Sequence, residues 1–122
     1  MSLFESGEDY LEAILMLSEK QDSVHAIDVV NKLGLSKPSV SIALKKLKDG
    51  GYLTIDHNNH IHLTDSGHDV ASKIYDRHKI LTSILVKLGV NEETAEEDAC
   101  KLEHDLSDES WEAIKKASEK II

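Results

Sequence analysis

Six side chains that commonly bind divalent metals occur at helical spacings in three stretches of the chain: Asp9, Glu12, His78, Cys100, Glu103 and His104. The first two are three residues apart and the last three are spaced i, i+3 and i+4, so each set shares one face if its segment is helical. Carboxylates, imidazoles and a thiolate suit a first-row divalent ion, because oxygen ligands accept manganese or iron and sulfur favours softer ions. A compact fold that joins the three stretches would therefore create a metal site.

Each of these residues also has a simpler interpretation. A single cysteine on a helix is often a small buried hydrophobe, and acids in a first helical turn interact favourably with the helix dipole. A structural zinc site would carry more cysteine and histidine and fewer acids. The prediction of a metal site therefore depends on the combination of residues rather than on any one of them.

Apolar residues with a period of 3.6 predict the helices that carry these ligands. The first helix is expected over 6–21 and the second over 25–33, where Gly34 ends it. Ser36 is a suitable N-cap for a third helix that runs to about Asp49. In the third helix, Val40, Leu44 and Leu47 are expected to face inward. The apolar residues that predict the first two helices are Tyr10, Leu11, Ile14, Leu15, Leu17, Ala26, Val29, Val30 and Leu33.

Two short strands are expected after the third helix, over Tyr52–Asp56 and His60–Thr64. The turn between them contains residues that tolerate positive φ. Histidines 57, 60 and 62 are interpreted as exposed wing residues, although they also admit a metal site. The order helix, helix, turn, helix, hairpin predicts a winged helix-turn-helix over residues 1–70.

A helical domain is expected to follow over residues 71–122. Its first helix is capped by Thr64 or Ser66 and runs to about Leu88, and two more are expected over 91–106 and 108–121. The last two helices carry apolar residues that need a partner: Leu102, Leu106, Trp111 and Ile114. The predicted fold is therefore mainly α with a small β-hairpin wing, followed by a helical metal-binding domain that forms a homodimer.

The third helix has the size that fits the major groove of duplex DNA. Its outward-facing residues are candidates for contacts to phosphates and base edges: Ser36, Lys37, Pro38, Ser39, Ser41, Lys45, Lys46 and Lys48. Two alternatives stay open, because winged helices also bind proteins and because surface lysines can serve solubility only. DNA binding is the favoured interpretation.

Charge is distributed unevenly along the chain. The formal net charge of the 122 residues is −9, but residues 20–64 hold six lysines against four acids, and residues 88–112 hold ten acids against Lys101. The acidic excess therefore lies away from the predicted DNA-binding helix. It is either a solvated helix face or a source of oxygen ligands for a cation.

Composition narrows the class further. With 40% hydrophobic and 30% charged residues, the chain is expected to be soluble and globular. It has no apolar run of about 18 residues that would predict a membrane span, and its N-terminus lacks the features of a signal peptide. The single Cys100 cannot form a disulfide within the chain. These features predict a cytoplasmic protein.

Five segments resemble the diphtheria toxin repressor and manganese transport regulator family of metal-dependent transcriptional regulators: Glu8–Ile14, Ser36–Ser41, Arg77–His78, Ala99–His104 and Leu106–Asp108. The Cys-x-x-Glu-His run followed by Leu-Ser-Asp is the most specific of them. The resemblance implies a homodimeric repressor that binds operator DNA and responds to Fe²⁺ or Mn²⁺, for which Co²⁺, Ni²⁺ or Zn²⁺ can substitute. It also implies that the regulatory metal is bound at the six positions named first.

The sequence combines features of two branches of this family. The acids Asp9 and Glu12 resemble the manganese-sensing branch, whereas Cys100 resembles the iron-sensing branch, so the resemblance leaves iron and manganese both open. Thr82 stands where the iron branch carries an acid of a second site. Glu96 is placed one turn before Cys100 and could supply a further oxygen.

The resemblance also implies an arrangement of domains and a mechanism. The chain ends at Ile122 and so resembles the short form of the family, without a further C-terminal domain. In the family the metal links the first helix to the fourth and fifth helices, which positions the DNA-binding helix. Metal and DNA then favour the same conformation, so each promotes binding of the other.

Two other classes of function compete with this one. A winged-helix regulator could respond to an oxidant or an organic ligand, with Cys100 as a redox switch. Carboxylate–histidine sites on helices also hold catalytic iron or manganese. The sequence offers no nucleophile–base pair and is short for a substrate site, so no enzyme activity is expected.

Overall fold

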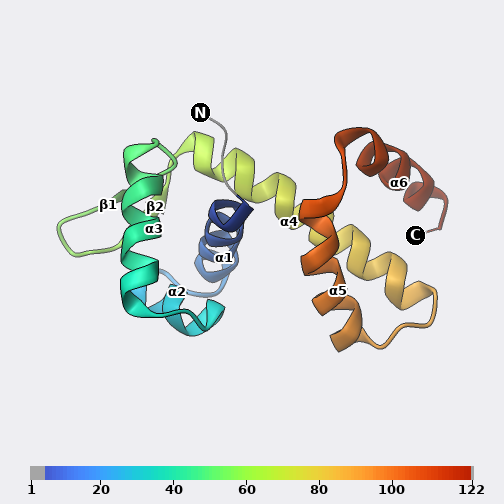
Figure 1. The fold of residues 1–122 in the computed structure, drawn as a ribbon, viewed down its shortest axis with the longest axis horizontal. Coiled ribbons are helices and arrows are strands. Elements are labelled where there is room, and N and C mark those ends of the chain that lie inside the picture. Colours follow the sequence, from blue (N-terminus) through green and yellow to red (C-terminus); the bar gives the residue numbers. More distant parts are fainter. Residues whose placement is uncertain (1–4, 122) are drawn as a thin grey trace. The chain divides into compact units, whose positions relative to one another are not determined.

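The computed structural model describes residues 5–121, which form six helices and one β-hairpin (Figure 1). In chain order the elements are α1 (Glu5–Lys20), α2 (Ala26–Leu33), α3 (Lys37–Asp49), β1 (Leu53–Ile55), β2 (Ile61–Leu63), α4 (Asp65–Lys87), α5 (Glu92–Asp105) and α6 (Asp108–Ile121). Two compact units divide the chain, one up to Ser72 and one from Lys73 onward, so the boundary falls inside α4. Between residues 5 and 121, no helix is long and apolar enough to cross a membrane.

The turn between α2 and α3 forms as the sequence predicts. Gly34 ends α2 in the left-handed region at φ 66°, and its N–H donates to the Val30 carbonyl at 2.9 Å. The Ser36 hydroxyl oxygen accepts the Ser39 N–H at 3.2 Å, so Ser36 is the N-cap of α3. These two helix ends fix the helix-turn-helix.

The hairpin is antiparallel, with Thr54 opposite His62, and is one residue shorter at each strand end than predicted. At the turn end, Asp56 and His60 lie outside the strands, and the Asn59 N–H donates to the Asp56 carbonyl at 2.9 Å. Asn59 has φ 65°, as its residue type allows. His62 is exposed as expected, whereas the side chain of His60 is only 32% exposed.

The core of the first unit joins α1, α2 and α3 to the hairpin and to the start of α4. Its buried residues are Tyr10, Leu11, Ile14, Val24, Val29, Val40, Ala43, Leu44, Leu47, Leu53, Ile61 and Ala71. Ala26 begins α2, as its place in the predicted helix requires, but its side chain is exposed. Val24, in the connection between α1 and α2, is buried. Its carbonyl accepts the Ile61 N–H at 2.8 Å, which joins this connection to β2.

The second unit packs the later part of α4 with α5 and α6. Its buried apolar cluster contains Leu81, Ala99 and Trp111. Asn91 caps α5 through its side-chain oxygen, which accepts the Glu93 N–H at 2.9 Å. The helix ends lie within one residue of those predicted, so the prediction of a mainly helical fold with a β-hairpin wing is confirmed.

Gly67 is required by a close approach of two backbones. It lies in the first turn of α4, where a Cβ would collide with the Tyr52 carbonyl oxygen and lie 2.9 Å from its carbonyl carbon. That same carbonyl accepts the Thr64 N–H at 3.1 Å, so neither backbone can move away cheaply.

We expect Gly67→Ala to destabilise the first unit by about 1–3 kcal/mol, the usual cost of overpacking. Urea unfolding followed by far-UV circular dichroism, at one protein concentration, measures this. Ser66→Ala, an exposed neighbour, is the control and should change the free energy by less than about 0.5 kcal/mol. Equal midpoints for the two variants would contradict the close approach.

Candidate metal centre and DNA-binding surface

The second unit places a fully buried carboxylate, Glu103 of α5, between two imidazoles. Nδ1 of His78, on α4, lies 3.1 Å from Oε2 of Glu103. Nε2 of His104 lies 3.4 Å from Oε1, with a geometry that is not a hydrogen bond. Three of the six predicted metal ligands are therefore neighbours within this unit.

The donor chemistry of this cluster fits a divalent cation. Oε1 of Glu103 accepts no hydrogen bond from any residue that the structure describes. A buried carboxylate in this state is costly unless a cation or a proton compensates it. Imidazole nitrogens and carboxylate oxygens are ligands that first-row divalent ions accept. Glu103, His78 and His104 are therefore suited to hold such an ion.

Arg77 holds the backbone of this cluster in place. Its Nη1 donates to the carbonyl oxygen of Glu103 at 3.3 Å, and its Nη2 donates to Oδ1 of Asp108 at 2.9 Å. The guanidinium also lies over the Trp111 ring, 5.5 Å from its centroid. One side chain of α4 thus fixes the end of α5 to the start of α6.

The remaining candidates on α4 and α5 have different surroundings. Cys100 is exposed, and within residues 5–121 its sulfur belongs to no group of three potential ligand atoms that lie within 4.8 Å of one another. Glu96 is exposed as well. Thr82 donates its hydroxyl to the His78 carbonyl at 2.7 Å, inside its own helix. Position 82 therefore carries a hydroxyl group that is bonded within α4, and not an acid that could bind a second ion.

The first unit carries the other two predicted ligands, Asp9 and Glu12, one turn apart on α1. Asp9 is half-buried, and the Glu12 side chain is 6% exposed. The core residues Tyr10 and Leu11 lie between them in sequence and fix the helix in the unit. Both carboxylates are therefore attached to the packed body of the winged helix.

The outer face of α3 presents every predicted DNA contact to solvent. All eight candidates are exposed: Ser36, Lys37, Pro38, Ser39, Ser41, Lys45, Lys46 and Lys48. The opposite face of α3 is buried and contains Val40, Leu44 and Leu47. One residue was not predicted here: Ile42 lies on α3 with 60% of its surface exposed. It could have been identified because it falls outside the inward-facing spacing of α3.

Comparison with known proteins decides the family. Residues 2–61 match the N-terminal DNA-binding domain of the iron-dependent repressors. Residues 64–121 match the metal-binding and dimerisation domain of the same family. The chain belongs to the iron-dependent repressor family. The predicted resemblance is thereby confirmed, together with the winged-helix fold and the class of metal-dependent DNA-binding regulator.

Individual members of this repressor family are similar over most of the chain. An uncharacterised HTH-type transcriptional regulator of Methanocaldococcus jannaschii is 41% identical over 119 residues, which cover 96% of this chain and 95% of the relative. The transcriptional regulator MntR of Escherichia coli is 32% identical and is covered to 73%. A solved manganese-dependent transcriptional repressor in complex with manganese superposes with a TM-score of 0.83 at 32% identity. The match covers 92% of this chain but only 52% of the solved protein.

We expect Arg77→Met to destabilise the second unit of this repressor by about 1–3 kcal/mol, because it removes a charged hydrogen bond to the Glu103 carbonyl. The ion pair with Asp108 adds little, since that carboxylate side chain is 95% exposed. Urea unfolding followed by Trp111 fluorescence measures the change. Lys73→Met, an exposed lysine one turn earlier, is the control. Equal stability of both variants would show that Arg77 does not support the cluster.

Proposed function

We propose that this chain is a repressor whose regulatory ion, Fe²⁺ or Mn²⁺, is bound by six residues: Asp9, Glu12, His78, Cys100, Glu103 and His104. The observation that carries the proposal is the buried Glu103 carboxylate, whose Oε1 accepts no hydrogen bond from residues 5–121. A bound divalent ion supplies the positive charge that this carboxylate requires. His78 and His104 supply nitrogen ligands on either side of it.

Asp9 and Glu12 connect this centre to the DNA-binding surface. They are carried by α1, which packs against α2, α3 and β2 within the first unit. A restraint on these two carboxylates therefore restrains the whole winged helix, including the exposed face of α3. The metal-loaded conformation is the one that binds DNA, so binding of either partner promotes binding of the other.

The donor set supports iron and manganese over other ions. Five of the six residues offer carboxylate oxygen or imidazole nitrogen, as Mn²⁺ and Fe²⁺ accept, and Cys100 adds one softer ligand. The related E. coli protein is named MntR, and the similar solved repressor is a complex with manganese. Co²⁺, Ni²⁺ and Zn²⁺ would occupy the same ligands as substitutes.

The partner of the winged helix is an operator in duplex DNA, bound by a homodimer with two-fold symmetry. Of the four apolar residues expected to need a partner, Leu102 is 39% exposed and available to a second copy, whereas Trp111 is buried in its own unit with Leu106 and Ile114 packed against it. Leu88, which was not among the four, is 73% exposed and could also be covered by a second copy. The protein acts in the cytoplasm, where it would reach its operator. Its role is regulatory rather than catalytic.

Metal should increase operator affinity by roughly 5–150-fold, the usual range of coupling between two sites. The DNA is a duplex selected from a random library in the presence of Mn²⁺, and binding is followed by fluorescence anisotropy with Mn²⁺, anaerobic Fe²⁺ or a chelator. Glu103→Gln keeps the shape of the side chain but removes its charge, so it should lose most of the metal response.

Two control variants separate the metal response from DNA contact. Glu109→Gln changes an exposed acid of α6 and should respond to metal as the unmodified protein does. Lys45→Ala should weaken binding with and without metal, since it removes a phosphate contact of α3. If chelation leaves affinity unchanged, or if Glu103→Gln responds like Glu109→Gln, the metal-sensing function is wrong.

Cys100→Glu should shift the ranking of activating metals toward manganese, because it replaces the soft ligand by a hard oxygen. Activation midpoints for Mn²⁺, Fe²⁺ and Co²⁺ measure the ranking, with Cys100→Ser as the variant that removes sulfur without adding charge. An unchanged ranking would show that sulfur is not the selector. Since Cys100 is exposed, loss of DNA binding on peroxide treatment without metal would instead support a redox switch.

A further inference from the structure

A second group of metal ligands lies on the wing, within the first unit and apart from the ligands proposed above. It consists of Asp56, which directly follows β1, of His60, which directly precedes β2, and of His62 within β2. One ligand atom from each residue lies within 4.8 Å of the other two. Nε2 of His62 is 2.9 Å and Nδ1 of His60 is 3.7 Å from the same carboxylate oxygen, Oδ2 of Asp56.

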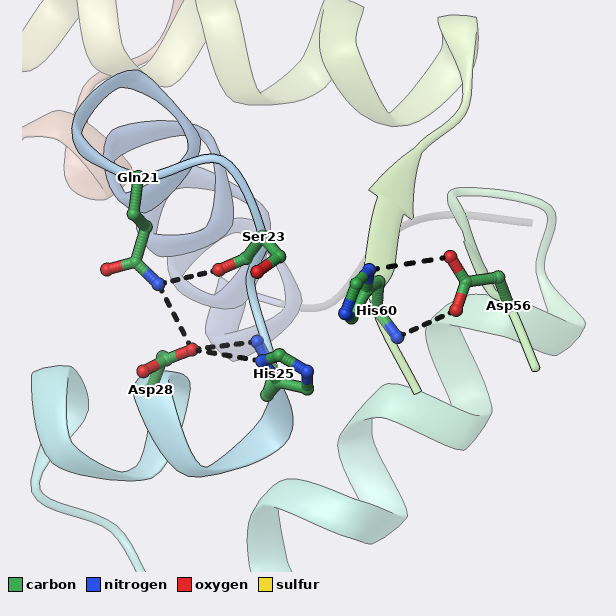
Figure 2. Close-up of polar contacts among 6 residues, drawn as sticks. All are labelled: Gln21, Ser23, His25, Asp28, Asp56 and His60. Carbon is green, nitrogen blue, oxygen red and sulfur yellow. Dashed lines mark hydrogen bonds and ion pairs between the residues drawn. The ribbon is translucent and has the colours of Figure 1, made fainter. Parts of the chain in front are cut away.

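The hairpin turn holds the Asp56 carboxylate in this orientation. Its Oδ1 accepts the backbone N–H of Asn58 at 2.8 Å and that of His60 at 3.0 Å. Figure 2 shows the carboxylate facing His60, with one oxygen on the backbone and the other toward the ring. The turn therefore fixes Oδ1 and leaves Oδ2 directed at both imidazoles.

The surroundings of Asp56 favour its ionised form. The hydrogen bond with His62 is the main cause that holds the pKa of Asp56 well below its usual range, and the backbone hydrogen bond from His60 adds to it. An ionised carboxylate with a fixed oxygen and two imidazoles is a common ligand set of zinc and related ions. Neutral imidazoles can present a lone pair where they now bond to the carboxylate.

The spacing of the three atoms fits one ion. A tetrahedral ion with bonds of about 2.0–2.2 Å holds neighbouring ligand atoms roughly 3.3 Å apart. The two distances to Oδ2, 2.9 and 3.7 Å, lie on either side of this value. The side chains of His60 and His62 are 32% and 57% exposed, which leaves room for water as a fourth ligand.

We propose that Asp56, His60 and His62 form a wing site for a zinc-class divalent cation, with Oδ2, Nδ1 and Nε2 as the respective ligand atoms. Two imidazoles, a carboxylate and no sulfur favour Zn²⁺, Co²⁺ or Ni²⁺ over Mn²⁺, following the general order of affinity for divalent ions. The ion would replace the contacts that the two imidazoles now make with Asp56.

The ring of His60 is also positioned from outside the hairpin. It packs edge-on against the ring of His25, with centroids 4.6 Å apart and planes at 88°. His25 precedes α2 and donates its backbone N–H to Oδ2 of Asp28 at 2.8 Å, an oxygen that also accepts from Gln21 (Figure 2). A cation on His60 would therefore stabilise the wing against the start of α2.

The wing cation would also change the charge beside the DNA-binding helix. With neutral imidazoles the three ligands carry the single negative charge of Asp56, and a divalent ion makes the group positive. A positive wing attracts phosphates and increases the salt dependence of DNA binding. This consequence depends on the proposed function, whereas the metal site itself does not.

Histidine ring nitrogens report directly on this site in the full-length protein. We would titrate the ¹⁵N-labelled chain with Zn²⁺, without DNA, and follow the ring signals in long-range ¹H–¹⁵N spectra. The rings of His60 and His62 should shift together and saturate, while His57 of the same turn should not. The same shifts should persist in Glu103→Gln, which separates the wing from the regulatory centre. Unshifted His60 and His62 rings in excess zinc would overturn the proposal.

Variants test the ligands one at a time by zinc competition with a chelating dye. His62→Gln should weaken zinc binding at the wing site at least tenfold. Removing a residue that only hydrogen-bonds to a metal ligand already lowers metal affinity by about 10–100-fold. Asp56→Asn should do the same while it keeps an acceptor for the two backbone N–H groups of the turn. His57→Gln is the matched control and should bind as the unmodified chain does. Unchanged affinity in both ligand variants would contradict the site.

Discussion

A buried carboxylate needs compensation, and Glu103 imposes this requirement on every helix of the second unit. It draws His78 of α4 to one oxygen and His104 of α5 to the other, at 3.1 and 3.4 Å. Arg77 donates to the Glu103 backbone and to Asp108, so α6 is fixed by the same arrangement. Breaking one partner of a buried ionic group costs about 3–5 kcal/mol. Since burying the Glu103 carboxylate without a cation costs free energy, Glu103 is a suitable position for sensing a cation.

The first unit joins the two predicted ligands, Asp9 and Glu12, to the exposed face of α3 through the packing of its core. On α1 the carboxylates of Asp9 and Glu12 flank Tyr10 and Leu11, which are part of the core. That core also contains Leu44 and Leu47 of α3, whose opposite face is exposed. Protein interiors are close-packed and transmit displacement rather than absorb it. No dedicated pathway is needed between these two carboxylates and the exposed face of α3, because both belong to the same packed unit.

Residue patterns predicted the parts of this protein that depend on local chemistry. Gly34, Ser36 and Asn91 end or begin helices because of interactions within a few residues, and the structure has them where expected. Patterns failed where partners are distant in sequence: the burial of Val24 depends on its bond to Ile61. The pairing of Asp56 with His62 likewise needs the hairpin register, which places residues six apart within 2.9 Å.

The predicted metal ligands show the same limit more clearly. Helical spacing put Glu103 and His104 on one face, and they are neighbours in the structure, whereas the proximity of His78 on a different helix could not follow from spacing. Spacing treated Cys100 as equivalent to them, yet Cys100 is exposed whereas Glu103 is fully buried. Since a helix face is about 100° wide, its edges can differ completely in environment. Helical spacing alone therefore does not show which residues of one face share a buried environment, and here it did not distinguish the exposed Cys100 from the buried Glu103.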